Sequence, residues 1–233
     1  MTTISKLARI AGLLYILASG VGFLRLGYIP KTLFVQGDAA ATANNIVAHE
    51  FLFRLGLLSE LLGAVLWLFV PLALYRLLQG VDQELARLMV ILGGLIPVPL
   101  FFANVVTDVA ALLFARGSDF LSVIDKPQRD AFVKLFLSLH HHLDLANMVF
   151  WGLWLVPFGV LVYRSRFLPR FLGVWLIIAC FAWLALSLSG FLFPAYEDRV
   201  DTLTQPLALG EVVMMLWLAV MATREPRLAA AKI

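Results

Sequence analysis

Several ionisable side chains lie inside the long apolar runs of this chain, and five of them are the first candidates for chemistry. Glu60, Asp108, His140, Asp144 and Glu211 fall, by the topology argued below, in the same half of a membrane. A charged side chain at the centre of a bilayer costs roughly 2.5–3.5 kcal/mol on insertion scales, and less near the interface. These groups must therefore pair with one another, bind a ligand or reach water, so we expect the functional site in this half.

The strongest local pattern surrounds residue 140. His140, Asp144, Asn147 and Trp151 have the spacing i, i+4, i+7 and i+11, so on a helix they form one stripe. A histidine and a carboxylate one turn apart could ligate one metal ion, or the carboxylate could fix the tautomer of an imidazole whose other nitrogen does the work. The same pair could also be only a hydrogen bond that lowers the cost of burial. All three interpretations stay open.

Polar residues on the other apolar runs widen the candidate set. Asn104 and Asp108 are also one turn apart, and we expect Asp108 to be solvated or to pair with another helix. Arg54 has two interpretations of equal weight. It is an anion clamp for a substrate, or it is the ion-pair partner of Asp144 or Glu211 on a neighbouring helix.

Carboxylates and imidazoles are ligands that zinc, iron and manganese accept, and they also form proton relays. The sequence has no His-Glu-x-x-His motif, no Gly-x-Ser-x-Gly turn, no phosphate-binding glycine loop and no pair of cysteines, so no known reaction class is indicated or excluded. The candidates by role are His140, Glu60 and Glu211 for catalysis; His140, Asp144, Glu60 and Glu211 for a divalent metal ion; and Arg54, Asn104, Asp108, Asp144, Asn147 and Trp151 for ligand binding.

The composition indicates what kind of protein carries these residues. The chain has 233 residues, of which 62% are hydrophobic and 14% charged, whereas a soluble domain has about 45–50% apolar and about 25% charged residues. Its mean hydropathy is +0.92, which indicates several membrane-spanning helices. The net charge is +3 and the pI about 9.2. Because the cations flank apolar runs, orientation in a membrane explains them better than nucleic-acid binding. The single cysteine, Cys180, excludes a disulfide within the chain.

Six apolar runs are long enough to cross a bilayer, and the cations at their ends predict the orientation. We expect spans at about 7–29, 52–78, 86–115, 132–163, 168–193 and 206–223. Ten cations flank one side, and the tight turn from Arg164 to Arg170 has three of them with no acid, so both termini are predicted to be cytoplasmic. These ten are Lys6, Arg9, Arg76, Arg87, Arg164, Arg166, Arg170, Arg224, Arg227 and Lys232. Arg25, near the outer end of the first span, is expected to snorkel to the interface.

The first span is expected to be retained in the protein. The apolar run from Ala11 to Ile29 is longer than the core of about 7–15 residues in a secretory signal, and it has no convincing cleavage site.

Two outer loops and one internal break have further sequence signals. Residues 37–50, with Asp38 as N-cap, predict a short helix at the outer interface, and residues 117–130 predict another, with Ser118 or Asp119 as N-cap. They either cover a pocket or are only connectors.

In the third span, the segment from Gly93-Gly94 to Pro97 and Pro99 predicts a kink or an unwound piece near the midplane. Such breaks occur at transporter sites, but proline is also simply more frequent in membrane helices.

An ordered set of short motifs resembles a known family. They are Ala8-Arg-Ile-Ala-Gly-Leu-Leu-Tyr15, Gly37-Asp-Ala-Ala-Ala-Thr42, Phe53-Arg-Leu-Gly56, Leu137-Ser-Leu-His140, Tyr163-Arg-Ser-Arg-Phe-Leu-Pro169, Leu172-Gly173 and Gly210-Glu211. The chain from about residue 6 to 222 is similar to a bacterial membrane family catalogued as a domain of unknown function, number forty-three eighty-six. The resemblance implies a six-helix fold and a membrane location, but no reaction. Its pattern matches Arg54, Glu60, His140 and Glu211 and has no acid at Asp144, which favours His140, Glu60 and Glu211 as the core set.

We therefore expect an all-α, multi-pass protein of the bacterial cytoplasmic membrane, with six transmembrane helices in one domain over residues 1–233. The leading hypothesis is a polar pocket in the outer half, built from helices two, three, four and six. The pocket would bind a small ligand or a divalent metal ion, with lipid- or quinone-linked chemistry as one form. In it His140 is a base or ligand, Glu60 and Glu211 are acids or ligands, and Arg54 is an anion clamp.

Two alternatives come from other classes of protein. One is a proton- or ion-coupled transporter of small molecules, and the other is a non-catalytic partner in a membrane complex, with polar residues that hold helices together. Membrane lipid is an expected partner and nucleic acid is not. The sequence leaves open whether the protein is an enzyme, which substrate or metal it binds and how many copies assemble.

Overall fold

The structure, a computed structural model, describes residues 3–220, and within them it contains helices and no strands. Six helical segments are long and apolar enough to cross a membrane: Thr3–Leu33, Glu50–Leu78, Gln83–Arg116, Lys126–Arg164, Arg170–Leu192 and Pro194–Val220. The predicted all-α fold with six transmembrane helices is therefore confirmed. The end of the sixth predicted span, 221–223, and the cations Arg224, Arg227 and Lys232 lie outside the described residues.

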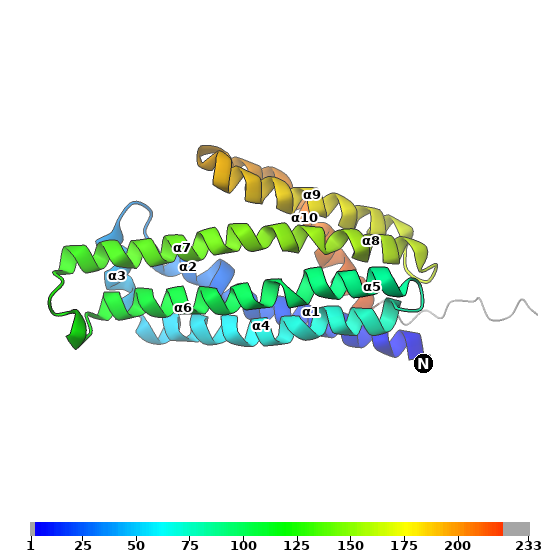
Figure 1. Ribbon diagram of the computed structural model, residues 1–233, viewed down its shortest axis with the longest axis horizontal. Coiled ribbons are helices and arrows are strands. Elements are labelled where there is room, and N and C mark those ends of the chain that lie inside the picture. Colours follow the sequence, from blue (N-terminus) through cyan, green and yellow to red (C-terminus); the bar gives the residue numbers. More distant parts are fainter. Residues whose placement is uncertain (1–2, 221–233) are drawn as a thin grey trace, which may run out of the picture. The chain divides into compact units, whose positions relative to one another are not determined.

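Several of the six segments consist of more than one helical element (Figure 1). In chain order the elements are α1 (Thr3–Phe23), the π-helix η1 (Leu24–Tyr28), α2 (Ile29–Leu33), α3 (Ala39–Ala48), α4 (Glu50–Leu78), α5 (Gln83–Val90), the π-helix η2 (Ile91–Leu95), α6 (Pro97–Arg116), the 3₁₀ helix η3 (Asp119–Leu121), α7 (Lys126–Leu153), α8 (Leu155–Arg164), α9 (Arg170–Leu192), the 3₁₀ helix η4 (Pro194–Tyr196) and α10 (Glu197–Val220).

The described chain forms two compact units. Unit 1 comprises the described parts of 1–17, 66–97 and 145–233, and unit 2 comprises 18–65 and 98–144. The first four spans contribute residues to both units, because the division falls inside α1, α4 and α7 and between Pro97 and Val98. The expectation of one domain over the whole chain stays a prediction.

The core of unit 2 is apolar and takes two residues from each of five helices. They are Ile29 and Leu33 from α2, Ala43 and Ile46 from α3, Phe53 and Leu57 from α4, Ala111 and Leu112 from α6, and Val133 and Leu137 from α7. In Figure 1, α6 and α7 run side by side in this unit, joined by the loop that carries η3. Each helix thus turns one apolar stripe to the others, as the spacing of these residues requires.

Of the two short helices predicted in the outer loops, the structure contains the first as α3 but not the second as it was predicted. Asp38 caps α3 as expected, since its Oδ1 accepts a hydrogen bond of 2.8 Å from the N–H of Ala41. The 117–130 segment instead forms only the short η3, and α7 begins early because Oδ1 of Asp125 accepts a 2.9 Å hydrogen bond from the N–H of Gln128. Whether either segment lies at the membrane interface stays a prediction.

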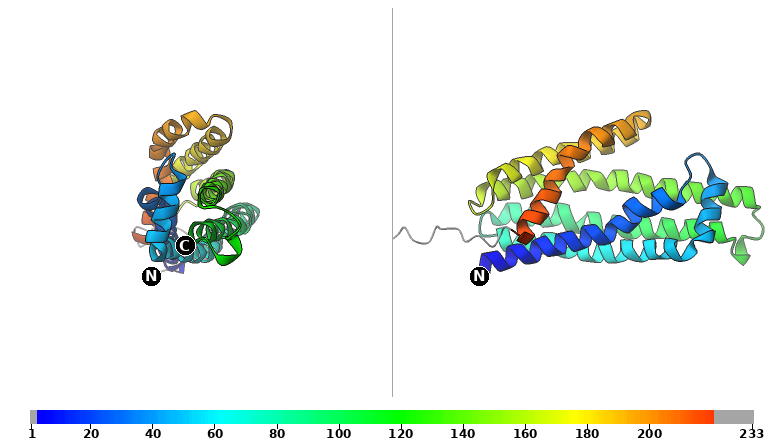
Figure 2. Two further views of the ribbon diagram at one scale, coloured as in Figure 1. Left: turned by 90° about the vertical axis from the view of Figure 1, so that its left-hand side faces the viewer. Right: turned by 180° about the vertical axis from the view of Figure 1, so that it is seen from behind.

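In unit 1, α8 and α9 approach closely at two glycines. An added Cβ on Gly159 would lie 2.5 Å from the carbonyl oxygen of Gly173, and one on Gly173 would lie 2.5 Å from that of Gly159. Helix backbones that approach this closely within a membrane depend on such small residues. After η4 the chain reverses and α10 returns against α9 (Figure 2).

The third span is irregular where the break was predicted, since the π-helix η2 replaces regular α-helix and ends two residues before Pro97; the position at the midplane stays a prediction. In a regular α-helix the N–H of residue 97 would bond the carbonyl of Gly93, but proline has no N–H. The indole Nε1 of Trp67 donates to that oxygen at 2.8 Å instead. The first span also has a π-helix shortly before a proline, because η1 ends two residues before Pro30. In the third span, the side chain of Trp67 thus satisfies the carbonyl of Gly93, which lipid could not.

Candidate functional site

Unit 2 brings together six buried polar side chains, which we call the polar cluster. Elements far apart in the sequence supply them: η1 gives one, α4 one, α6 two and α7 two. All have relative exposures of 8% or less, and they are Arg25, Glu60, Asn104, Asp108, His140 and Asp144. Burial of so many polar groups within helices apolar enough to span a membrane requires close pairing. Their contacts therefore define the candidate site.

Arg25 and Asp108 form the best-defined contact of the polar cluster. The guanidinium donates from Nε to Oδ2 of Asp108 and from Nη2 to Oδ1, the second bond at 2.7 Å. This two-pronged arrangement suits the planar guanidinium and is stronger than a single ionic hydrogen bond. Arg25 is 3% exposed and Asp108 is fully buried. The pair therefore fixes the carboxylate of Asp108 in one orientation.

His140 lies between two carboxylates. Its Nδ1 is 3.1 Å from Oδ1 of Asp108, and its Nε2 is 3.3 Å from Oδ2 of Asp144, one helical turn away. Neither ring nitrogen has good hydrogen-bond geometry, although both distances are short. Asp144 is itself fixed by Asn104, whose Nδ2 donates to Oδ1 at 2.6 Å. The imidazole is thus in contact with both carboxylates but is optimally bonded to neither.

Glu60 has the least satisfied side chain of the polar cluster. It is 6% exposed, and neither of its carboxylate oxygens has a hydrogen-bond partner. Among the described residues its one ion pair is with Arg25, whose Nε lies 4.0 Å from Oε2. Oδ1 of Asn104 is also buried without a partner. Because buried polar groups are almost always hydrogen-bonded, a carboxylate left in this state indicates a site that binds something.

Three residues of the polar cluster lie close enough together that they could hold one metal ion. Glu60, Asp108 and His140 each offer one ligand atom, and these atoms lie within 4.8 Å of one another. Two carboxylate oxygens and one imidazole nitrogen form a donor set that zinc, iron or manganese accepts. In the described part of the chain this is the one such group of at least three residues.

Glu211, the remaining predicted catalytic acid, belongs to unit 1. Its carboxylate accepts hydrogen bonds from the hydroxyl of Tyr15 and, at 2.6 Å, from Nε1 of Trp183. Asn147 and Trp151 lie in the same unit. Asn147 donates from Nδ2 to the carbonyl of Pro97 at 3.4 Å, and the ring of Trp151 packs edge-to-face on that of Trp183.

Arg54 is half exposed and pairs with Glu50 on the preceding turn of α4 at 2.7 Å. Arg116 also approaches Glu50, at 3.5 Å. Neither Asp144 nor Glu211, the two partners suggested from the sequence, forms this ion pair within the described residues.

The expectation that Arg25 snorkels to the interface is wrong. Its guanidinium turns inward, because the two hydrogen bonds that it donates to Asp108 outweigh solvation at the membrane surface. One sequence signal could have identified this role. Arg25 lies inside an apolar run, in the half of the membrane where the sequence also predicts four carboxylates, so it is a natural counter-ion for one of them.

The six spans define a multi-pass α-helical membrane protein. Within that class, the chain belongs to the family described as "Domain of unknown function (DUF4386)", whose sequence profile matches residues 10–222. The resemblance noted from the short motifs is thereby confirmed. Comparison with curated proteins and with solved structures gave no match. Because the family description names no activity, function must be argued from the polar cluster.

Proposed function

We propose that the polar cluster binds a divalent metal ion through Glu60, Asp108 and His140, within the membrane-spanning region. The observation that carries the proposal is the carboxylate of Glu60, buried with both oxygens unbonded next to two further ligand atoms. The unsatisfied oxygens of Glu60 and Asn104 are all acceptors. Such a set is completed by a cation or by hydrogen-bond donors, and not by another acceptor.

The position of His140 favours a cation next to its Nδ1. If the proton of a neutral His140 lies on Nε2, facing Asp144, then Nδ1 of His140 carries a lone pair. That lone pair faces Oδ1 of Asp108 at 3.1 Å. Two lone pairs at this distance repel unless a positive ion lies between them. With metal–ligand bonds of about 2.1 Å and angles of roughly 90–110°, two ligand atoms are about 3.0–3.4 Å apart. The observed separation falls in that range.

The charges of the polar cluster also favour a divalent ion. Glu60, Asp108 and Asp144 contribute three negative charges. Within the described chain Arg25 is the one lysine or arginine that reaches them. With a neutral imidazole the excess is two negative charges, which one divalent ion offsets. Asp144, held by Asn104, would then act as the outer partner that orients a metal-ligating histidine.

The test is the metal content of detergent-purified protein, stripped with a chelator and reloaded separately with Zn²⁺, Mn²⁺ or Fe²⁺. Mass spectrometry should find about one ion per chain for wild type, and at least tenfold less for Glu60→Gln and His140→Ala. Glu50→Gln is the matched control, because Glu50 is an acid of the same unit that pairs with Arg54. Thermal unfolding of each sample shows whether the variants are folded. Substoichiometric metal in wild type with all three ions would overturn the proposal.

A proton relay is the second candidate, favoured by the imidazole between two carboxylates. A doubly protonated His140 would donate toward both Asp108 and Asp144 and carry the cation itself. In this case reconstituted vesicles should take up or release a small substrate in response to a pH gradient, and His140→Ala should abolish the flux. Stoichiometric metal in wild type together with unchanged flux in His140→Ala would reject the relay.

A further inference from the structure

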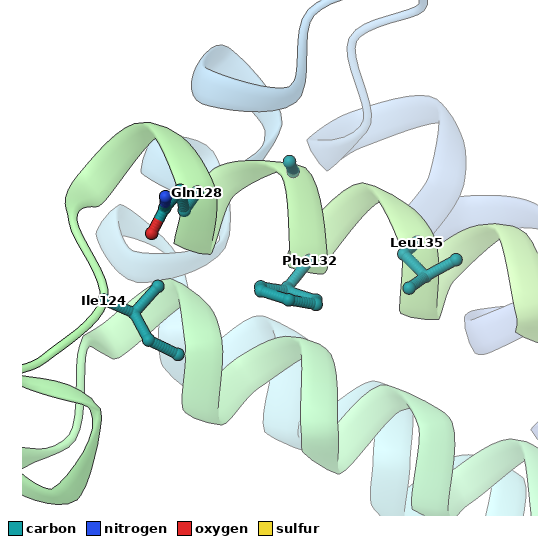
Figure 3. Close-up of a pocket in the computed structure, with 5 residues that line it drawn as sticks. Ile124, Gln128, Phe132 and Leu135 are labelled. Carbon is teal, nitrogen blue, oxygen red and sulfur yellow. The ribbon is translucent and has the colours of Figure 1, made fainter.

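An apolar groove lies at the start of α7, independent of the polar cluster. It is lined by Ile124, Gln128, Ala131, Phe132 and Leu135 and has a volume of about 580 Å³. Figure 3 shows the amide of Gln128 and the side chain of Ile124 at one end, with Phe132 and then Leu135 further along the helix. Gln128, Ala131, Phe132 and Leu135 follow the spacing i, i+3, i+4 and i+7 of one helix face.

The wall of the groove is apolar and is packed by stacked aromatic rings. Phe132 is stacked on Phe114 of α6 with ring centroids 4.8 Å apart, and Phe136 is also stacked on Phe114, with centroids 5.6 Å apart. Phe132 and Leu135 nevertheless keep 38% and 49% of their surface exposed. On a membrane-spanning helix, such a surface faces acyl chains.

At the loop end of the groove Lys126 and Asp130 form an ion pair, and one further charge of each sign remains, on Arg129 and Asp125. The guanidinium of Arg129 lies over Gly117 and donates from Nη1 to the carbonyl of Ile124 at 3.1 Å. Within residues 3–220, no carboxylate lies within ion-pair distance of Arg129. Asp125 is exposed at the same end, where its carboxylate caps α7 through the N–H of Gln128.

The depth of these groups matches the anatomy of a lipid. The apolar run of the fourth span is predicted to begin at residue 132, so Arg129 lies about one turn before it, where an arginine reaches phosphate groups. Leu135 is six residues further along, about 9 Å deeper at 1.5 Å per residue. Charge therefore lies at headgroup level and apolar side chains lie at acyl-chain level.

We propose that this groove is a binding site for one zwitterionic membrane phospholipid. The phosphate would lie against Arg129, the ammonium group against Asp125, and one acyl chain along Phe132 and Leu135. Gln128 would donate to an ester oxygen between them. A headgroup with both charges offers a counter-ion to Arg129 and to Asp125, whereas an anionic headgroup is repelled by the carboxylate of Asp125 and an uncharged one gives Arg129 no counter-ion.

The experiment measures lipid retained by the detergent-purified protein in native mass spectrometry. Wild type is equilibrated in mixed micelles with phosphatidylethanolamine, phosphatidylglycerol or diacylglycerol of identical acyl chains. We expect phosphatidylethanolamine to be retained best, phosphatidylglycerol about fivefold less and diacylglycerol least. Ala131→Phe, which fills the middle of the groove and leaves all charges in place, should lower phosphatidylethanolamine retention at least fivefold. Leu139→Phe is the matched control, because Leu139 is an exposed apolar residue of α7 outside the groove.

Two charge variants separate the parts of the headgroup. Arg129→Gln should remove the preference for phosphatidylethanolamine over diacylglycerol, and Asp125→Asn, which keeps the helix cap, should remove the preference over phosphatidylglycerol. Equal retention of all three lipids by wild type would overturn the proposal. So would equal losses in Ala131→Phe and Leu139→Phe, because they would mean that only nonspecific surrounding lipid is measured. Circular dichroism confirms that each variant keeps its helices.

Discussion

Neutralising Arg25 is expected to destabilise the protein strongly, because it would leave Asp108 as a buried charge without its main partner. The pair has exposures of 3% and 0% and is joined by two hydrogen bonds. Breaking a buried ion pair by removing one partner costs about 3–5 kcal/mol. Interhelical hydrogen bonds in membrane proteins average about 0.6 kcal/mol and reach about 1.7. Arg25→Met should therefore cost about 3 kcal/mol, roughly a hundredfold in the unfolding equilibrium.

The measurement is a double-mutant cycle of unfolding in mixed micelles, with Arg25→Met, Asp108→Leu and the double variant. The double variant should cost less than the sum of the single variants by at least about 1.5 kcal/mol, since no charge then remains without its partner. Arg54 and Glu50 are the matched control pair. They are 50% and 29% exposed, so their removal should change stability by about 0.3–0.5 kcal/mol.

Two results would refute this reasoning about the Arg25–Asp108 pair. A cost below about 1 kcal/mol for Arg25→Met would show that water or another group solvates Asp108. Additive single effects would show that the two side chains act independently despite their contact.

Three further predictions concern other parts of the chain. Glu60→Gln should raise the thermal stability of chelator-treated protein by a few degrees, because a neutral amide replaces an unbonded buried carboxylate; a lower melting temperature would contradict this. Gly159→Leu should destabilise the α8–α9 crossing by about 1–3 kcal/mol or more in unfolding experiments, whereas Gly20→Leu, with open space where its Cβ would lie, should have little effect. A membrane-impermeant thiol reagent should label Ser122→Cys but not Arg166→Cys in intact cells, and the reverse result would overturn the predicted orientation.

The positions of the helices could be predicted from the sequence because they follow from local properties. Apolar length determined the six spans, the two prolines indicated the break at η2, and Asp38 indicated the start of α3. The 117–130 segment was harder, because the competing N-cap at Asp125 is as good a signal as Ser118 or Asp119.

The composition of the polar cluster could be predicted only in part. Helical spacing correctly groups His140 with Asp144, and Asn104 with Asp108, since each pair lies on one turn of one helix. Which helix faces which other helix depends on tertiary packing, so the joining of Arg25 to Asp108 could not follow from spacing alone. For the same reason Glu211 was grouped with Glu60, while the structure gives it Tyr15 and Trp183 as partners in unit 1.

The indole of Trp67 donates to the carbonyl of Gly93 in place of the N–H that Pro97 lacks. This contact should couple the evolution of positions 67 and 97, which are 30 residues apart in the chain. A relative that exchanges Pro97 for another residue regains the amide hydrogen and no longer needs a tryptophan at 67. One that keeps the proline must keep an indole or another side-chain donor there. These two columns of a family alignment should therefore change together.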